Sequence, residues 1–184
     1  MNFTQRLTEV RLVRDAYLFA SAAHFAVGQK RKFSGEDYIV HPVDVAKIVH
    51  GVKNSTDTMV AAALLHDTVE DTQVTTSVIQ SYFGAEVADL VEWLTNVTTL
   101  EDGNRKTRKK LDRERMWKAP YEAQTIKVAD VIANLSDIER QDESFSKVYF
   151  PEKKLLLAGM NADETLLKRA KEIISNYEGR NVKR

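Results

Sequence analysis

Apolar residues recur along most of the chain at helical spacing, and the stretches between them are short and polar. The first such stretch predicts a helix from about Thr4 to Val27, which Gly28 ends. A basic loop follows, and a second helix is expected to begin at Pro42, because proline is favoured in a first helical turn. Residues 38–40 (YIV) are the one apolar run suited to a strand, and they are too few to found a sheet.

The third predicted helix contains an uninterrupted apolar run, residues 59–65 (MVAAALL). Capping residue types at 54–57 (NSTD) precede this run, and we expect the helix to continue into His66 and Asp67. Shorter helices are expected from about Thr75 and from Ala85.

Breaks in the second half of the chain mark the remaining helices. Residues 102–104 (DGN) interrupt the chain before a basic stretch, and Pro120 separates that stretch from a helix over residues 121–141. One or two terminal helices are expected after Pro151. The pattern therefore predicts an all-α fold.

Composition narrows the class of protein. With 184 residues, 43% of them hydrophobic, the chain is expected to form a single domain over residues 1–184. The absence of cysteine excludes disulfides, thiolate metal ligands and a cysteine nucleophile. The net charge is zero, which gives no support for nucleic-acid binding. No apolar run reaches the length of a membrane span and no signal-peptide pattern opens the chain, so a cytoplasmic location is expected.

Four polar residues, His66, Asp67, Glu70 and Asp71, follow directly on the apolar run of the third helix. Burying them is costly unless something binds them, and a metal ion is the best compensation. Residues four apart share a helix face, so on a continuous helix all four would lie on a stripe of about 140°. His66 and Asp67 are then expected to bind one ion, while Glu70 and Asp71 lie one turn further, near enough to move a proton.

Further polar residues occur at positions suited to complete this site. His41 precedes Pro42, where its side chain can project across a helix N-terminus. Asp130 lies inside an otherwise apolar helix, and Asn134 shares its face four residues on. Two imidazoles and two carboxylates form a mixed nitrogen and oxygen donor set that suits Mn²⁺, Fe²⁺ or Zn²⁺ better than Ca²⁺.

Three segments, "YIVHP", "AALLHDTVED" and "IKVADVIANLSDI", occur in that order and together resemble the histidine–aspartate (HD) hydrolase superfamily. Within it the chain is most similar to the alarmone hydrolases, which comprise the hydrolase half of Rel/Spo proteins and the Mesh1-like small alarmone hydrolases. The resemblance spans about Phe19 to Leu157. The combination of these three segments is far more specific than a bare His-Asp pair.

The resemblance implies a compact multi-helix HD-domain fold with a single metal site. It makes one divalent ion, usually Mn²⁺ in this family, the cofactor. The implied catalytic acids are Glu70 and Asp71, and Asn134 is the implied substrate-positioning residue. The implied metal ligands are His41, His66, Asp67 and Asp130.

The implied reaction is hydrolysis of guanosine (or adenosine) 5′-di/triphosphate 3′-diphosphate to pyrophosphate and the nucleoside 5′-di- or triphosphate. Such a substrate carries many phosphates, which suits the local basic clusters. We expect Arg31 to stack on the base and Lys32 to meet the phosphates. Further expected substrate contacts are Arg108 and Lys109, from the basic stretch, and Tyr149.

The basic loop departs from the family pattern "GQxRKSGEPYI", since it reads "GQKRKFSGEDYI" with an extra residue and Asp37 in place of proline. Phe33 is the extra residue, and the division of roles among Lys30, Arg31 and Lys32 therefore stays open.

Several alternatives remain at this point. A nucleoside 5′-monophosphatase of the same superfamily would keep the metal ligands, although the adjacent Glu70-Asp71 pair argues against it. A non-catalytic alarmone-binding module would be expected to have lost ligands or acids, and none is missing. The expected partner is a small-molecule nucleotide, with neither nucleic acid nor membrane. A homo-oligomer, and functional pairing with an alarmone synthetase as its neutralising partner, are left open.

Overall fold

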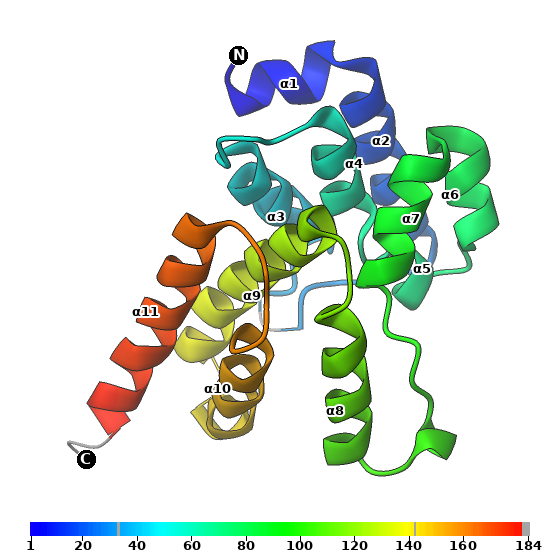
Figure 1. The fold of residues 1–184 in the computed structure, drawn as a ribbon. Helices are drawn as coiled ribbons and strands as arrows, with labels where there is room; N and C mark the ends of the chain where they lie inside the picture. The colour runs from blue at the N-terminus through cyan, green and yellow to red at the C-terminus, as the bar shows by residue number, and fades with distance from the viewer. Residues whose placement is uncertain (33, 142, 182–184) are drawn as a thin grey trace. The chain divides into compact units, whose positions relative to one another are not determined.

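The computed structural model describes residues 1–32, 34–141 and 143–181 (Figure 1). Contacts group the chain into two compact units, Met1–Asn96 and Val97–Arg184, and each unit is considered by itself. Every regular element among the described residues is a helix, which confirms the predicted all-α fold. A lone β-bridge joins Lys30 and Asp37 in the basic loop. A single domain over residues 1–184 stays a prediction.

The first unit is arranged around one buried helix, α4. This helix packs against α2, α3 and α7, and all its residues from Met59 to Leu65 are buried. The Thr56 hydroxyl accepts a hydrogen bond of 3.1 Å from the backbone N–H of Met59 and so caps its start. Each fully buried leucine stabilises the unit by about 1.5–3 kcal/mol. The helices of this unit are α1 (Phe3–Glu9), α2 (Arg11–Ala26), α3 (Val40–His50), α4 (Asp57–Leu65), α5 (Thr68–Asp71), α6 (Thr76–Phe83) and α7 (Ala85–Leu94).

The single helix predicted from Thr4 to Val27 is wrong, because the chain breaks at Val10 into α1 and α2. The break lets α1 turn so that the buried Arg6 side chain reaches the loop before α4. There Arg6 Nε lies 2.7 Å from Asp57 Oδ1, and Nη1 donates to the Ser55 hydroxyl at 3.0 Å. The apolar periodicity continues through Val10, so it could not reveal this long-range pairing.

The continuous helix predicted through His66 and Asp67 is also wrong, since α4 ends at Leu65. Two of the last carbonyl groups of α4 accept hydrogen bonds from side chains. His66 Nδ1 donates to the Ala63 carbonyl at 2.8 Å, and the Thr68 hydroxyl donates to the Leu65 carbonyl at 2.7 Å. Because these groups satisfy the helix end, the chain turns at His66 and Asp67 and restarts as α5.

In the second unit, α9 packs against both α10 and α11. The side chains of Gln124 and Thr125 on α9 accept hydrogen bonds from the backbone N–H groups of Asn161 and Asp163, at 2.7 and 3.1 Å. These bonds tie the connection between α10 and α11 to α9. The elements are η1 (Leu100–Asp102), a 3₁₀ turn, then α8 (Arg105–Met116), α9 (Tyr121–Gln141), α10 (Glu143–Leu157) and α11 (Glu164–Asn181).

The predicted limits of α9 are confirmed, whereas the break expected at Pro151 is not found. Pro151 lies inside α10. Its neighbour Phe150 is almost fully buried and stacks on Tyr177 of α11, with ring centroids 3.9 Å apart. This packing offsets the helical hydrogen bond that proline cannot donate.

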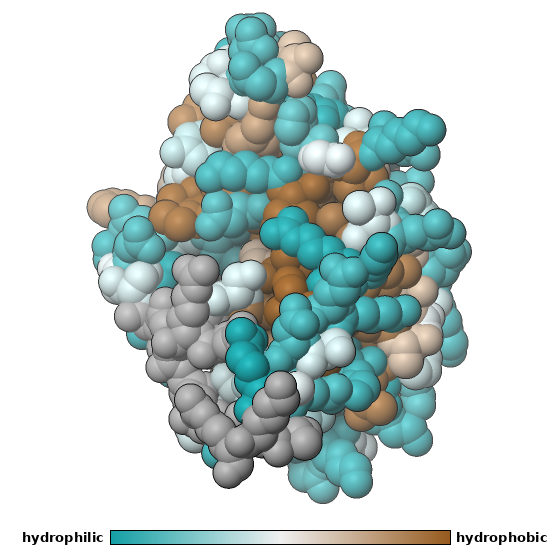
Figure 2. Space-filling model, turned by 90° about the vertical axis from the view of Figure 1, so that its left-hand side faces the viewer, coloured by the Kyte–Doolittle hydropathy of each residue, from teal (hydrophilic) through white to brown (hydrophobic). Residues whose placement is uncertain are grey.

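One face of the molecule, drawn in Figure 2, carries mostly hydrophilic side chains with smaller apolar areas between them. Among the described residues, none of the helices combines the length and the apolar character that crossing a bilayer requires.

Candidate active site

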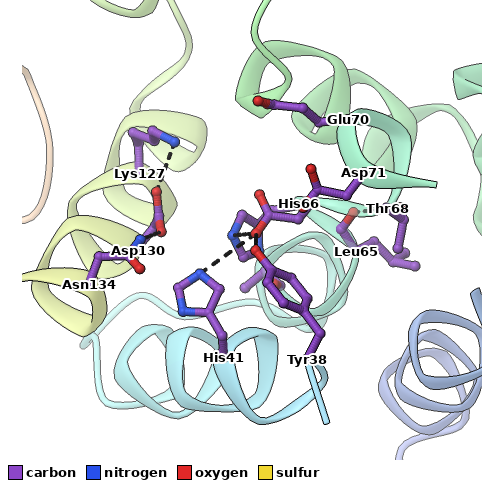
Figure 3. Close-up of polar contacts among 12 residues, drawn as sticks. Tyr38, His41, Leu65, His66, Thr68, Glu70, Asp71, Lys127, Asp130 and Asn134 are labelled. Atoms are coloured by element: carbon purple, nitrogen blue, oxygen red, sulfur yellow. Dashed lines mark hydrogen bonds and ion pairs between the residues drawn. The ribbon is translucent and has the colours of Figure 1, made fainter. Parts of the chain in front are cut away.

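Two imidazoles of the first unit converge on one carboxylate (Figure 3). His41 lies in the first turn of α3, and His66 and Asp67 form the turn after α4. The Nε2 atoms of His41 and His66 lie 3.7 and 3.0 Å from Oδ2 of Asp67. The two imidazole rings are 5.2 Å apart between centroids. Two nitrogens and one oxygen therefore gather within a few ångströms.

Neighbouring groups fix how these side chains point. Since a carbonyl only accepts, the bond to Ala63 places a proton on Nδ1 of His66 and turns Nε2 toward Asp67. The Tyr38 hydroxyl donates to Asp67 Oδ2 at 2.6 Å. Both imidazoles are buried, with 3% of His41 and 1% of His66 exposed.

This donor set fits a divalent transition metal. Neutral imidazole nitrogens and a carboxylate oxygen are ligands for Mn²⁺, Fe²⁺ or Zn²⁺. The bond from His66 to a backbone carbonyl is typical of histidine that ligates a metal, because it fixes the tautomer and the ring orientation. The first unit thus brings His41, His66 and Asp67 together as the sequence predicts.

The two further acids, Glu70 and Asp71, lie on α5, each with its own amide partner. Asn96 donates to Glu70 from its backbone N–H at 3.2 Å and from Nδ2 at 3.0 Å. Gln29 Nε2 donates to Asp71 Oδ2 at 2.9 Å. Partial burial raises the pKa of the Asp71 carboxyl, and the carboxylates of Asp67 and Glu70 raise it further, while the Gln29 hydrogen bond lowers it.

The basic loop of this unit closes on itself. The Arg31 N–H donates to the Glu36 carbonyl at 2.9 Å, and the Gly35 N–H donates to the Arg31 carbonyl at 3.0 Å. Gly35 has φ of 73°, a value that glycine adopts without strain. Arg31 is half-buried and Lys32 is exposed. Phe33 lies outside the described residues.

In the second unit, both oxygens of Asp130 are bound within its own helix, α9. Lys127 Nζ lies 2.8 Å from Oδ2, and Asn134 Nδ2 donates to Oδ1 at 2.5 Å (Figure 3). The predicted pairing of Asp130 and Asn134 on one helix face is therefore observed. Asn134 positions Asp130 in this arrangement.

The other predicted substrate residues of this unit lie on α8 and α10. Arg108 and Lys109 are half-buried, and Tyr149 is buried. The Lys153 ammonium lies 4.7 Å from the Tyr149 ring centroid. Burial, and then the ammonium of Lys127, lower the Lys153 pKa to about 8.

The sequence of this chain matches that of a known protein family. The sequence profile of the HD domain family matches residues 16–154. The chain belongs to the HD domain family.

Curated relatives of this HD domain include guanosine-3′,5′-bis(diphosphate) 3′-pyrophosphohydrolases named MESH1. The Xenopus tropicalis protein is 39% identical over 132 residues, covering 68% of this chain and 72% of the relative. The human protein is 39% identical over 140 residues, covering 72% and 73%. The bifunctional (p)ppGpp synthase/hydrolase SpoT of Escherichia coli K12 is 43% identical over 98 residues, which are 53% of this chain and 13% of SpoT.

A solved structure of a metazoan ortholog of SpoT that hydrolyzes ppGpp is also similar to this HD domain. It superposes with a TM-score of 0.79 at 26% identity and covers 91% of this chain and 96% of its own. The predicted HD-type fold is confirmed by these matches.

The sequence pattern predicted no site role for Tyr38, His24, Gln29 or Asn96. Tyr38 lies inside the quoted segment "YIVHP", so its position beside His41 was a usable signal. The amides of Gln29 and Asn96 carried no comparable signal, since their distance in sequence from α5 hides the contact.

Proposed function

We propose that this HD domain hydrolyses guanosine (or adenosine) 5′-di/triphosphate 3′-diphosphate. The products are pyrophosphate and the nucleoside 5′-di- or triphosphate. The observation that carries the proposal is the convergence of His41 and His66 on Asp67, with Glu70 and Asp71 on the next short helix. The pyrophosphohydrolase names of the MESH1 relatives support the choice of substrate.

The proposed cofactor is one divalent ion per chain, with Mn²⁺ as the metal. His41, His66 and Asp67 would hold it, and the observed donor set supports this assignment. Asp130 is proposed as the fourth ligand from the sequence pattern alone. When bound, such an ion lowers the pKa of water and neutralises charge on phosphate oxygens.

Glu70 and Asp71 are proposed to move the protons. The oxygen of water bonds to the phosphorus attached to the ribose 3′-oxygen, and the bond between that phosphorus and the 3′-oxygen breaks. One carboxylate takes a proton from the water, and the other carboxyl gives a proton to the departing 3′-oxygen. Burial and the neighbouring carboxylates of Asp67 and Glu70 raise the pKa of the Asp71 carboxyl, which suits Asp71 to give a proton.

The substrate contacts are proposals from the sequence pattern. Arg31 is assigned to the base and Lys32 to phosphate. Asn134 is assigned to substrate positioning, in addition to its bond with Asp130. The other assigned contacts are Arg108, Lys109 and Tyr149. A homo-oligomer, pairing with an alarmone synthetase and a cytoplasmic location stay predictions.

The test is incubation of the Mn²⁺-loaded protein with a panel of guanine and adenine 3′-diphosphate nucleotides, with products separated by chromatography. We expect pyrophosphate and a nucleotide that keeps all its 5′-phosphates. In ¹⁸O-water the label should enter pyrophosphate and not the nucleotide. Orthophosphate as the first product would favour the monophosphatase, and a retained, unchanged ligand would favour the binding module.

A further inference from the structure

A chain of hydrogen bonds runs from a buried histidine to one of the two proposed catalytic acids. His24 Nδ1 lies 2.7 Å from Oε1 of Gln29, and Gln29 Nε2 lies 2.9 Å from Oδ2 of Asp71. His24 is on α2, Gln29 is in the loop after it, and Asp71 ends α5, so all three belong to the first unit.

When Asp71 is ionised, the chain has only one consistent direction. An ionised carboxylate accepts only, so the Gln29 amide must present its NH₂ group to Asp71 and its carbonyl oxygen to His24. His24 then donates from Nδ1 to that carbonyl oxygen. Burial lowers the pKa of His24, which favours its neutral form. In this arrangement the His24 N–H holds the carbonyl oxygen of Gln29, and the NH₂ group of Gln29 faces Asp71.

The backbone holds Gln29 at the same place. Its N–H donates to the His24 carbonyl at 3.1 Å, so His24 binds both the main chain and the side chain of Gln29. Gly28 between them has φ of 65°, the left-handed conformation that lets the chain reverse at the end of α2. Gln29 therefore has little freedom to leave Asp71.

The His24 ring also braces the metal-binding side of the site. It packs against the Tyr38 ring at 4.7 Å between centroids, and the Tyr38 hydroxyl holds Asp67. One buried imidazole thus supports Asp71 through Gln29 and Asp67 through Tyr38.

We propose that Gln29, fixed by His24, is a positioning residue that holds the Asp71 carboxyl for proton transfer; the inference rests on the catalytic role proposed for Asp71. Gln29 donates a hydrogen bond to Oδ2 of Asp71, whereas Oδ1 receives none from the described residues. Oδ1 is then the oxygen that exchanges a proton with water or with the 3′-oxygen. Gln29 itself touches neither.

The variant that tests this is Gln29→Met, which keeps the length of the side chain and removes both hydrogen bonds. Asp71 is proposed to act in the chemical step and not in substrate binding. The Gln29→Met variant should therefore have a kcat lowered about 10- to 100-fold and a KM within about twofold of the natural value. Gln73→Met is the matched control, since Gln73 is exposed and lies two residues after Asp71. Its kcat should equal that of the natural protein. A Gln29→Met enzyme with unchanged kcat overturns the proposal.

Histidine variants test the other half of the chain. His24→Asn keeps an N–H close to the Nδ1 position and should retain kcat within about fivefold, whereas His24→Leu removes the donor and should match Gln29→Met. Equal losses in both would mean that His24 acts only through packing and would overturn its part of the proposal. Metal content and melting temperature, measured for each variant, identify a protein that has lost its fold.

A readout without turnover separates this inference from the proposed function. In protein loaded with diamagnetic Zn²⁺, the Asp71 carboxyl carbon is titrated by NMR and assigned with Asp71→Asn. Gln29→Met should raise the Asp71 pKa, because the anion loses its donor while the carboxylates of Asp67 and Glu70, which raise that pKa, still face it and His24 offsets them only in part. An unchanged Asp71 pKa contradicts the positioning role. If Gln29→Met raises the Asp71 pKa but the natural protein hydrolyses no nucleotide, the proposed function is rejected and the hold of Gln29 on Asp71 is not.

Discussion

The Tyr38 hydroxyl donates a hydrogen bond of 2.6 Å to Oδ2 of Asp67, the same oxygen that faces the His66 imidazole. Tyr38 thereby fixes which oxygen of the carboxylate points at the two histidines. A partner of this kind, bound to a ligand rather than to the metal, contributes to metal affinity by holding the ligand in place.

Tyr38→Phe should therefore weaken metal binding by about 10-fold or more, since partners behind the ligands typically contribute 10- to 100-fold. The helices should persist, because the ring and its packing against His24 are kept. Calorimetric titration of the metal-free protein with Mn²⁺ measures the effect. Tyr82→Phe is the control at an exposed tyrosine of α6. Equal Mn²⁺ affinity in the Tyr38 and Tyr82 variants would show that the hydroxyl does not orient the ligand.

The double variant Glu70→Gln with Asp71→Asn separates metal binding from proton transfer. Neither acid is proposed as a ligand, so the protein should still take up one metal ion per chain. Turnover should fall by about 10² or more, the usual size of acid–base catalysis. Metal content by atomic absorption and steady-state rates measure both effects. Loss of the metal would mean that one of these acids is a ligand.

Lys153 makes stability depend on pH in the second unit. Its half-buried side chain places the ammonium near Lys127 and Lys109, and the carboxylates of Asp130 and Glu152 offset this only in part. Below about pH 8 the lysine is charged in the folded and unfolded chains, and folding bears the full cost of burying it. Between about 8 and the ordinary value of 10.5, the folded form is neutral and the unfolded form still binds a proton, so that cost disappears as the pH rises.

Lys153→Met should accordingly stabilise the protein at pH 7 more than at pH 10.5, by about 1–3 kcal/mol. Urea unfolding of both proteins at the two pH values gives the difference. Lys154→Met is the matched control, because Lys154 is exposed and pairs with Glu178 at 2.8 Å. A pH-independent difference for Lys153→Met would mean that its ammonium is well solvated in the folded protein.

Gly159→Ala tests the packing of the second unit. A Cβ at this position would lie 2.5 Å from Cε2 of Trp117, whose indole N–H donates to the Leu156 carbonyl at 2.7 Å. The overlap should cost about 1–3 kcal/mol of stability. Gly179→Ala is the control, since a Cβ there meets nothing within 4 Å. Thermal unfolding should show a midpoint below that of the natural protein for Gly159→Ala and not for Gly179→Ala. A Gly159→Ala midpoint equal to that of the natural protein would show that the indole moves aside.

The fold could be predicted from sequence where local signals decided it. Pro120 and the capping types before α4 marked helix starts that the structure retains. The predictions at Val10 and Pro151 were wrong in opposite ways. A continuous helix was predicted through Val10, where the chain breaks, and a break was predicted at Pro151, where the helix continues. Distant partners determined both outcomes. Arg6 pairs with Asp57 at the start of α4, which fixes the direction of α1. Phe150 stacks on Tyr177, which stabilises α10 where it passes through Pro151.

The same distinction applies to the site. His66, Asp67, Glu70 and Asp71 were recognisable because they stand together in sequence, although the turn between α4 and α5 replaces the continuous stripe. The amides that hold the acids come from 26 and 42 residues away. No local pattern records contacts of that range.

The burial of α4 has a consequence for how the site can fail. His66 and Asp67 follow directly on α4, which packs against α2, α3 and α7. The backbone at His66 and Asp67 therefore cannot loosen unless α4 exposes its apolar residues to water. Amide protons of α4 should therefore be among the slowest to exchange with deuterium, and they should do so only through cooperative opening of the first unit. Under rising denaturant, metal release and α4 exchange should then report a single event.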